Sequence, residues 1–308
     1  MRTSEFLTEV RRAMGAPTYQ ARFSPTDVLE IASSQQTNFV VPQIRALRKD
    51  FFVVSKDISL STGDDTIPIP ARAAGRAVRK IWITDVTTSP AIGDFWELKY
   101  IDLSDVIALR ATGETFGYYF QDDDIKLFPP ASTSLLLRMF YLYRPGNLVL
   151  QSETCTVTAV GTDTLTVDAT PSNIAIGSKI DVVKVEPGFK TLVEDLTLTN
   201  RSFNSVTVSG YDFSTKSISV GDIVSLSRQT SVIQLPEDAH ELLVWSTANE
   251  MATSLGISDM IGHTEKQVLS ALNGMRQAFT PRSEDPQTII NGSSLLRSGT
   301  TRFGALLG

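Results

Sequence analysis

The chain has 308 residues, of which 42% are hydrophobic and 20% are charged, proportions that are typical of a folded globular protein. Its formal net charge of −6 argues against a general nucleic-acid binder, which usually carries a positive excess, although an acidic wall would let DNA slide past it. No apolar run approaches the roughly 20 residues that a membrane-spanning helix needs, and residues 1–12 are too charged for a signal peptide.

The first fifty residues predict two helices. Residues 4–14 place their apolar side chains on one helical face. A second helix is expected from Pro25, because Ser24 suits the N-cap, proline suits the first helical position, and Asp27 complements the helix dipole. Pro42 is expected to kink or break this helix, since proline lacks a backbone N–H.

From Phe51 onwards the pattern changes to short strands. Residues 57–60 and 66–69 predict a β-hairpin around the turn at residues 62–65. Residues 78–86 alternate as a further strand, and residues 101–109 predict a short helix opened by Asp102 or Ser104.

The next stretch is rich in aromatic and β-branched residues. Residues 118–120, 125–128 and 135–143 form three such runs, separated by a polar turn and by Pro129-Pro130. This pattern predicts a three-stranded meander. Its aromatic side chains could form a binding platform, but they more often fill the core of such a meander.

Residues 151–231 are dense in Thr, Ser and Val and contain an apparent repeat. Residues 164–168 resemble residues 205–209, and residues 174–180 resemble residues 218–224. We interpret these segments as two copies of a strand–turn–strand unit that form a small β-barrel or sandwich.

Helical spacing returns after Pro236, and a last helix is expected from Thr264 to the residues before Pro281. Residues 281–308 are rich in Ser, Gly, Thr and Arg, which predicts an extended arm that does not fold alone.

The expected fold class is therefore α+β, with a helical bundle, a β-hairpin and meander body, and an inserted all-β domain. We divide the chain into a first part of the body (1–150), an inserted β domain (151–231), a second, helical part of the body (232–280) and a C-terminal arm (281–308). Turn-like sequence at both insertion points suits such an insertion.

Few residues suggest chemistry. His240 and His263 have no second ligand at zinc spacing, and no G-x-S-x-G motif accompanies them. Cys155, the single cysteine, is most simply a core residue, and it excludes an intramolecular disulfide. Residues 122–124 lack the alternating spacing of a calcium loop. We therefore expect no catalytic residue, no metal site and no cofactor.

Basic side chains offer a possible contact surface for DNA phosphate or an acidic partner, with ordinary solvated surface as the alternative. The first cluster comprises Arg72, Arg76, Arg79 and Lys80, and the second comprises Arg45, Arg48 and Lys49. Because the chain is acidic overall, protein contacts are the favoured interpretation.

The order of these segments resembles the head-to-tail adaptor, or connector, proteins of tailed bacteriophages. The similar pieces are "SPTDVLEIASSQQTNFV", "TIPIPARAAGRAVRKIWI", "YYFQDDDIKLFPP…LLLRMFYLYRP" and "LPEDAHELLVWSTANEMA". The resemblance implies a ring in the virion, usually of twelve subunits, docked under the portal protein and contacting a tail, nozzle or tail-completion protein. It also implies that DNA passes through the ring without sequence-specific binding.

By the same resemblance, the C-terminal arm would reach the portal or a neighbouring subunit. The residues expected to make this contact are Leu295, Leu296, Arg297, Arg302 and Phe303.

Three other functions stay open from the sequence. A tail tube, collar or tail-completion protein would use the β insert between rings. A receptor- or carbohydrate-binding module would stack sugars on Phe203, Tyr211 and Phe213. A hydrolase would depend on His240 or His263.

Overall fold

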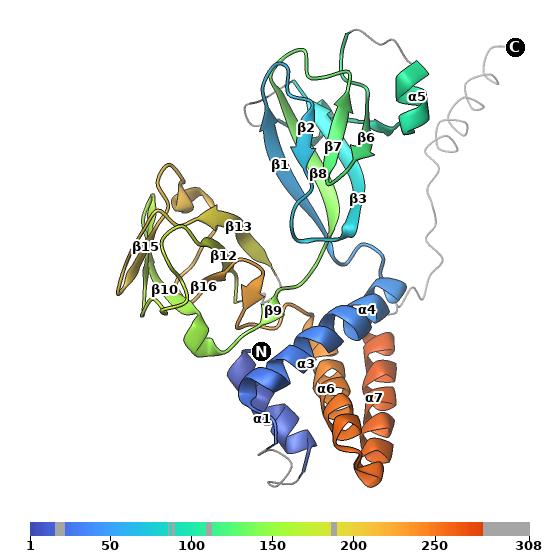
Figure 1. Ribbon diagram of the computed structural model, residues 1–308, viewed down its shortest axis with the longest axis vertical. Coiled ribbons are helices and arrows are strands. Elements are labelled where there is room, and N and C mark those ends of the chain that lie inside the picture. The colour runs from blue at the N-terminus through green and yellow to red at the C-terminus, as the bar shows by residue number, and fades with distance from the viewer. Residues whose placement is uncertain (16–21, 86, 88–89, 109–112, 186–189, 280–308) are drawn as a thin grey trace, which may run out of the picture.

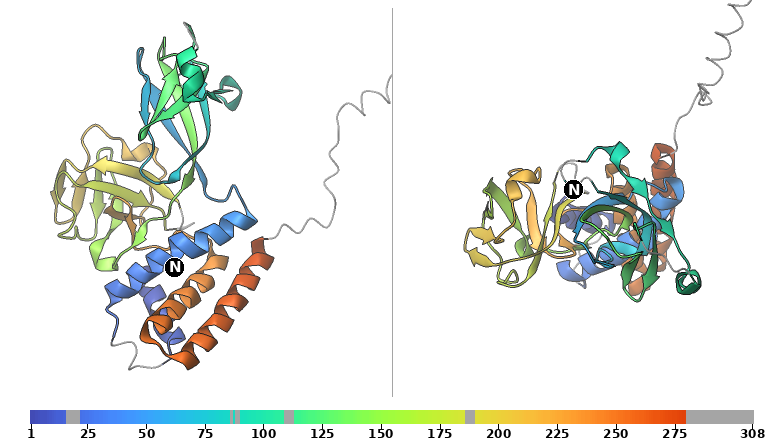
Figure 2. Two further views of the ribbon diagram at one scale, coloured as in Figure 1. Left: turned by 45° about the vertical axis from the view of Figure 1, so that its right-hand side comes forward. Right: turned by 90° about the horizontal axis from the view of Figure 1, so that it is seen from above.

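The computed structural model describes residues 1–308 except 16–21, 86, 88–89, 109–112, 186–189 and 280–308. The fold is mixed α+β with several sheets, and none of the sheets in these described residues closes into a barrel. The helices within residues 3–47 and 240–279 gather at one end of the molecule, the strands within residues 53–143 form the opposite end, and the strands within residues 155–226 lie to the side (Figures 1 and 2). No described helix is long and apolar enough to cross a lipid bilayer.

The helical region joins the two ends of the described chain. It contains α1 (Thr3–Ala13), α3 (Pro25–Gln35), α4 (Val41–Leu47), α6 (His240–Leu255) and α7 (Ser258–Phe279). Buried apolar side chains from all five helices form one core cluster, which includes Phe6, Leu29, Ile44, Leu243 and Met275.

Helix α3 begins as the sequence predicts. Ser24 Oγ accepts the N–H of Asp27 at 3.1 Å, and Asp27 Oδ2 accepts the N–H of Ser24 at 2.8 Å. This reciprocal capping box satisfies two backbone donors that the first helical turn leaves free, and Pro25 occupies the first turn.

Pro42 does not end the helix. A π-helical turn, η1 (Gln36–Val40), separates α3 from α4, and the Val41 N–H bonds to the Gln36 carbonyl. The wider π turn accommodates the ring of Pro42, which sits in the first turn of α4. At this predicted kink or break, the hydrogen bonding changes from α-helical to π-helical and the helix continues without a break.

The first β region spans residues 53–143 and consists of two four-stranded sheets. Its strands are β1 (Val53–Leu60), β2 (Thr66–Pro68), β3 (Ala73–Thr84), β4 (Trp96–Glu97), β5 (Lys99–Tyr100), β6 (Gly117–Gln121), β7 (Asp124–Phe128) and β8 (Leu135–Tyr143). The sheet orders are β1-β8-β3-β4 and β2-β7-β6-β5. Both sheets contribute to one core cluster, which includes Ile83, Leu137, Met139, Ile67 and Ile125. A short helix, α5 (Leu103–Ala108), follows β5, as predicted.

Two predicted pairings in this region are wrong. β1 pairs with β8 and β2 pairs with β7, so these two strands do not form the predicted hairpin. β6 and β7 do form a hairpin, but β8 leaves the predicted meander for the other sheet, between β1 and β3. The reason is that β8 buries every second residue and half-buries most of the others, which suits a central strand with a partner on each edge.

The second β region spans residues 155–226 and contains a single sheet. Its strands are β10 (Cys155–Val160), β11 (Thr164–Val167), β12 (Lys179–Val183), β13 (Thr191–Thr197), β14 (Asn200–Ser202), β15 (Ser205–Thr207) and β16 (Ile223–Leu226). The order is β13-β12-β16-β10-β11-β15-β14, and this sheet has its own core cluster. The predicted barrel is therefore wrong. Nor are there two separate sheets, because β10 pairs with β16 through Cys155 and Thr156 and with β11 from Val157 onwards.

The repeat within this region is supported by its strand pairing. The repeated segments pair with each other, with Leu165 opposite Val206 in β11 and β15, and Asp181 opposite Ser225 in β12 and β16. The two glycine turns are also equivalent, because the N–H of Gly177 bonds to the Leu198 carbonyl and the N–H of Gly221 to the Val157 carbonyl, each at 2.8 Å. The two copies are thus related by an approximate two-fold axis, and each places its turn against the other.

The chain enters and leaves the second β region at one place. Strand β9 (Asn147–Leu148) precedes the region and strand β17 (Gln229–Thr230) follows it. The two strands pair in parallel, with Asn147 opposite Gln229 and Leu148 opposite Thr230.

Candidate functional site

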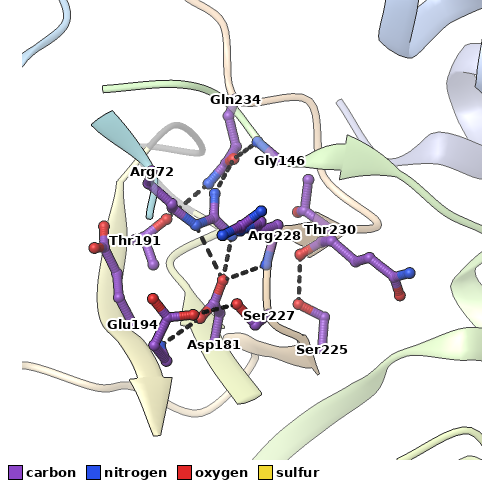
Figure 3. A network of polar contacts seen from close by, with 12 residues as sticks. Arg72, Gly146, Asp181, Thr191, Glu194, Ser225, Ser227, Arg228, Thr230 and Gln234 are labelled. Atoms are coloured by element: carbon purple, nitrogen blue, oxygen red, sulfur yellow. Dashed lines mark hydrogen bonds and ion pairs between the residues drawn. The ribbon is translucent and has the colours of Figure 1, made fainter. Parts of the chain in front are cut away.

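A buried ion pair connects the two β regions. Arg72, in the turn before β3, and Asp181, on β12, have side chains that are 2% and 0% exposed. Arg72 Nε lies 3.0 Å from Asp181 Oδ2, and Arg72 Nη2 contacts the same oxygen. The Asp181 carboxylate also accepts the backbone N–H groups of Asp195 and Arg228, each at 2.8 Å. The guanidinium group and the two backbone N–H groups therefore compensate the burial of this carboxylate (Figure 3).

Gln234 brings the helical region into the same network. Its Oε1 accepts the N–H of Gly146 at 2.6 Å and the hydroxyl of Tyr143 at 3.1 Å. Arg72 Nη1 donates to the Tyr143 hydroxyl at 2.7 Å, and Gln234 Nε2 donates to Thr191 Oγ1 at 3.0 Å. Gln234 lies shortly before α6, so residues from three parts of the chain meet here (Figure 3). We call this group the polar junction, and its members are Arg72, Tyr143, Gly146, Asp181, Thr191 and Gln234.

Burial and neighbouring groups shift the pKa values of several side chains in and beside the polar junction. Burial raises the pKa of Tyr143 to about 12, so its hydroxyl stays protonated. Burial works against the charged form of Arg72, but the neighbouring Tyr143 and Asp181 outweigh it and raise the pKa of Arg72. Burial also raises the pKa of Glu194, which accepts the hydroxyl of Tyr141 at 3.1 Å.

The polar junction is suited to fixing geometry rather than to catalysis. Its arginine, its carboxylate and its amide are all engaged with one another and with backbone groups. A buried ion pair of this kind costs desolvation energy, and its best-attested benefit is that it specifies one arrangement of the groups around it.

The predicted basic surface is not formed as expected. Arg72 is buried in the polar junction and does not face solvent. Arg79 pairs with Asp50 at 2.6 Å and also donates to the Lys49 carbonyl, and Lys80 pairs with Glu97 at 3.1 Å. The side chain of Arg76 lies outside the described part of the structure, and so do the predicted arm residues Leu295, Leu296, Arg297, Arg302 and Phe303.

The residues considered for chemistry are placed apart. His240 contacts the Leu235 carbonyl at 3.1 Å, and burial lowers its pKa. His263 packs edge-on against Trp245, with 5.9 Å between ring centroids. Burial raises the pKa of Cys155 to about 12, so this thiol is not a nucleophile near neutral pH. Among the described residues, no group of three His, Cys, Asp or Glu side chains could hold a metal ion.

The three aromatic residues proposed for sugar stacking do not form one platform. Phe213 is 0% exposed and belongs to the core of the second β region, where its ring lies 5.1 Å from that of Tyr211. Phe203 is 77% exposed. Phe213 is therefore not the loop-exposed residue that the sequence suggested.

Two surface features lie outside the predicted site residues. One is an open groove of about 520 Å³ between α3 and the β9–β17 pair, lined mainly by polar side chains such as Glu30, Ser33, Asn38 and Arg144. The other is a set of exposed aromatic and aliphatic side chains in the first β region, which includes Trp96, Tyr100 and Phe120. The aromatic composition of the first β region suggested a platform as the alternative to core packing, whereas nothing in the sequence suggested the groove.

No model of a known protein family matches the chain. The comparison with curated proteins also finds no match, so the geometry described above is the basis for a functional proposal.

Proposed function

We propose that this protein is a head-to-tail adaptor of a tailed bacteriophage and not an enzyme. In this proposal, twelve copies form a ring between the portal protein and a tail, nozzle or tail-completion protein of the virion. The ring would be made in the host cytoplasm and would leave a channel through which DNA passes without sequence-specific binding.

The observation that carries the proposal is the polar junction. A ring subunit must present the same shape at every position, because errors in geometry add up around a closed ring. Arg72, Asp181 and Gln234 tie both β regions to the helical region through buried contacts. A fixed arrangement of three separately packed cores suits a structural part better than it suits an enzyme.

The proposed architecture is a helical bundle with a β body, into which residues 151–231 are inserted as a domain. Two observations support this division. The parallel pairing of β9 with β17 places both ends of the insert side by side, and among the described residues the core of the second β region draws only on those between Cys155 and Leu226. Residues 1–150 and 232–280 would form the body, and residues 281–308 the arm.

The charge of the protein fits a channel wall. With a net charge of −6, the ring would repel rather than retain the DNA phosphates that pass through it. Affinity for the portal would instead come from many copies of the arm acting together, because the later contacts form at high effective concentration.

The experiment that tests this proposal is native mass spectrometry of the protein alone and after mixing with the portal of the same phage. We expect a monomer that becomes a ring of defined stoichiometry only when portal is present. A free ring or tube that forms without portal would favour a tail tube or collar protein. A protein that never binds portal would contradict the proposal.

A further inference from the structure

The exposed set of apolar side chains lies where one segment of the chain crosses between the two sheets of the first β region. β4 pairs with β3 in one sheet, and β5, two residues later, pairs with β6 in the other. Residues 94–103 therefore pass from one sheet to the other, and α5 follows directly.

The side chains in this set are unusually exposed for their type. Tyr100 is 57% exposed and Leu103 is 51% exposed, and Trp96, Phe116 and Phe120 are between 37% and 44% exposed. The rings of Tyr100 and Phe120 lie 5.9 Å apart, so they form a continuous surface rather than isolated exposures. We call these five residues the aromatic edge. Exposed apolar side chains that adjoin one another, as Tyr100 and Phe120 do, are a feature of docking sites.

The stretch of sequence that contains the aromatic edge is acidic, and one of its carboxylates, Glu97, is paired with Lys80. Residues 90–124 contain eight acidic and two basic residues, an excess that equals the net charge of the whole chain. Asp94, Asp102, Asp105 and Glu114 are exposed. An occupant of this surface must therefore be apolar and positively charged.

Residues 286–308 of this chain have that composition. They contain two arginines, Arg297 and Arg302, and no acidic residue. Their apolar residues come as Ile289-Ile290, Leu295-Leu296, Phe303 and Leu306-Leu307.

The last described residue before this segment lies close to the first β region. Helix α7 ends at Phe279, whose ring packs against that of Phe51 with 5.5 Å between centroids, just before β1 begins. An extended chain advances about 3.3 Å per residue, so residues 280–308 span up to roughly 95 Å, whereas strand β1 is about 27 Å long. Attachment at this point gives the segment a high effective concentration at the aromatic edge of its own chain.

We propose that residues 286–308 cover the aromatic edge of the same chain in the free protein. The two arginines lie among the acidic side chains around the edge, and the apolar residues pack on the exposed rings. This inference does not require the adaptor function. If the adaptor function holds, binding of the arm to a portal would uncover the aromatic edge, so that a second docking surface appears only after the first contact is made.

The test uses the full chain with Ser298→Cys, labelled with a photoactivatable maleimide. Cys155 is buried, so the new thiol is the one that reacts. Irradiation at a concentration where light scattering shows a monomer should give cross-links mainly on residues 92–121, mapped by peptide mass spectrometry. Cross-links that fall mainly on the helices or on the second β region would overturn the proposal.

Charge variants and isotope mixing sharpen this result. Reversing both charges with Arg297→Glu and Arg302→Glu should reduce the cross-links to the edge at least several-fold, whereas Arg282→Glu, in the same tail but outside the segment, should leave them unchanged. Equal loss in both variants would contradict the proposed charge pairing. In a mixture of light and heavy chains, cross-links between the two would assign the contact to a second copy and overturn the same-chain proposal. Because portal is absent throughout, failure here leaves the adaptor proposal standing.

Discussion

The two β regions have similar strands but obtain their cores in different ways. In the first region, β8 lies between β1 and β3, so its neighbours come from residues that are many positions away. In the second region, equivalent segments of a repeat pair with each other across an approximate two-fold axis. Strand pairing can thus be anticipated where a repeat supplies both partners, but not where a strand can pair in either of two sheets.

Their surfaces differ as well. The first region exposes the aromatic edge among acidic residues. The second exposes the aliphatic residues Ile176 and Val220, 61% and 70% exposed, at equivalent turns of the two copies. The exposed aromatic side chains of the first region thus have no counterpart among its other described residues, whereas the second region exposes an aliphatic side chain at the same turn of each repeat copy.

The largest expected effect comes from the contact that joins the two regions. Replacing Arg72 with methionine leaves the Asp181 carboxylate buried without its cation, which should reduce the free energy of unfolding by about 3–5 kcal/mol. Urea unfolding followed by circular dichroism measures this loss. Lys80→Met is the matched control within the first region, because its ion pair with Glu97 is half-exposed and should contribute less than about 1 kcal/mol. If both variants lost the same unfolding free energy, burial of the Arg72–Asp181 ion pair would contribute no extra stability.

The equivalence of the two repeat copies predicts matched effects at their turns. Gly177 and Gly221 have φ angles of 85° and 99°, and both have open space where a Cβ would stand. Alanine at either position should therefore cost about 1–2 kcal/mol of unfolding free energy through backbone strain alone.

The control for this pair lies in the first region. Gly93 also has open space around it but does not have a positive φ, so Gly93→Ala should cost much less. Thermal or urea unfolding of the three variants gives the comparison, and clearly unequal losses at Gly177 and Gly221 would break the proposed equivalence.

A smaller effect is expected in the pH dependence of stability. Burial raises the pKa of Glu194 above its ordinary value of 4.5, so the folded protein binds this proton more tightly than the unfolded chain does. The stabilisation is complete below about pH 4.5 and is lost as the pH rises through the folded-state pKa. Glu194→Gln should remove this decline from urea-derived stability profiles. Glu114→Gln, at an exposed carboxyl, should keep it, and an unchanged profile in Glu194→Gln would count against the assignment.

Local signals in the sequence predicted local structure well. The N-cap at Ser24, the helix after Asp102 and the hairpin of β6 and β7 follow from capping and turn chemistry within a few residues. These features need no knowledge of the rest of the fold, because their hydrogen bonds close between near neighbours.

The polar junction could not be predicted in the same way. Arg72 and Asp181 are 109 residues apart, and each looks like an ordinary surface charge in its own segment. In β12 the residues after Lys179 are all buried, so no alternation marks Asp181, whose carboxylate is buried in the polar junction. Only the three-dimensional meeting of the two β regions shows why a charge is placed there.

The parallel pair β9–β17 has a consequence for how such a chain can change over time. Because both connections to the second β region lie side by side, a domain of different size or fold could replace residues 151–228 without moving the helices or the first β region. The replacement would have to match the polar junction, above all by presenting a carboxylate to Arg72 or by appearing together with loss of that arginine. Homologous chains should therefore show exchange of this domain together with covariation at a single distant position.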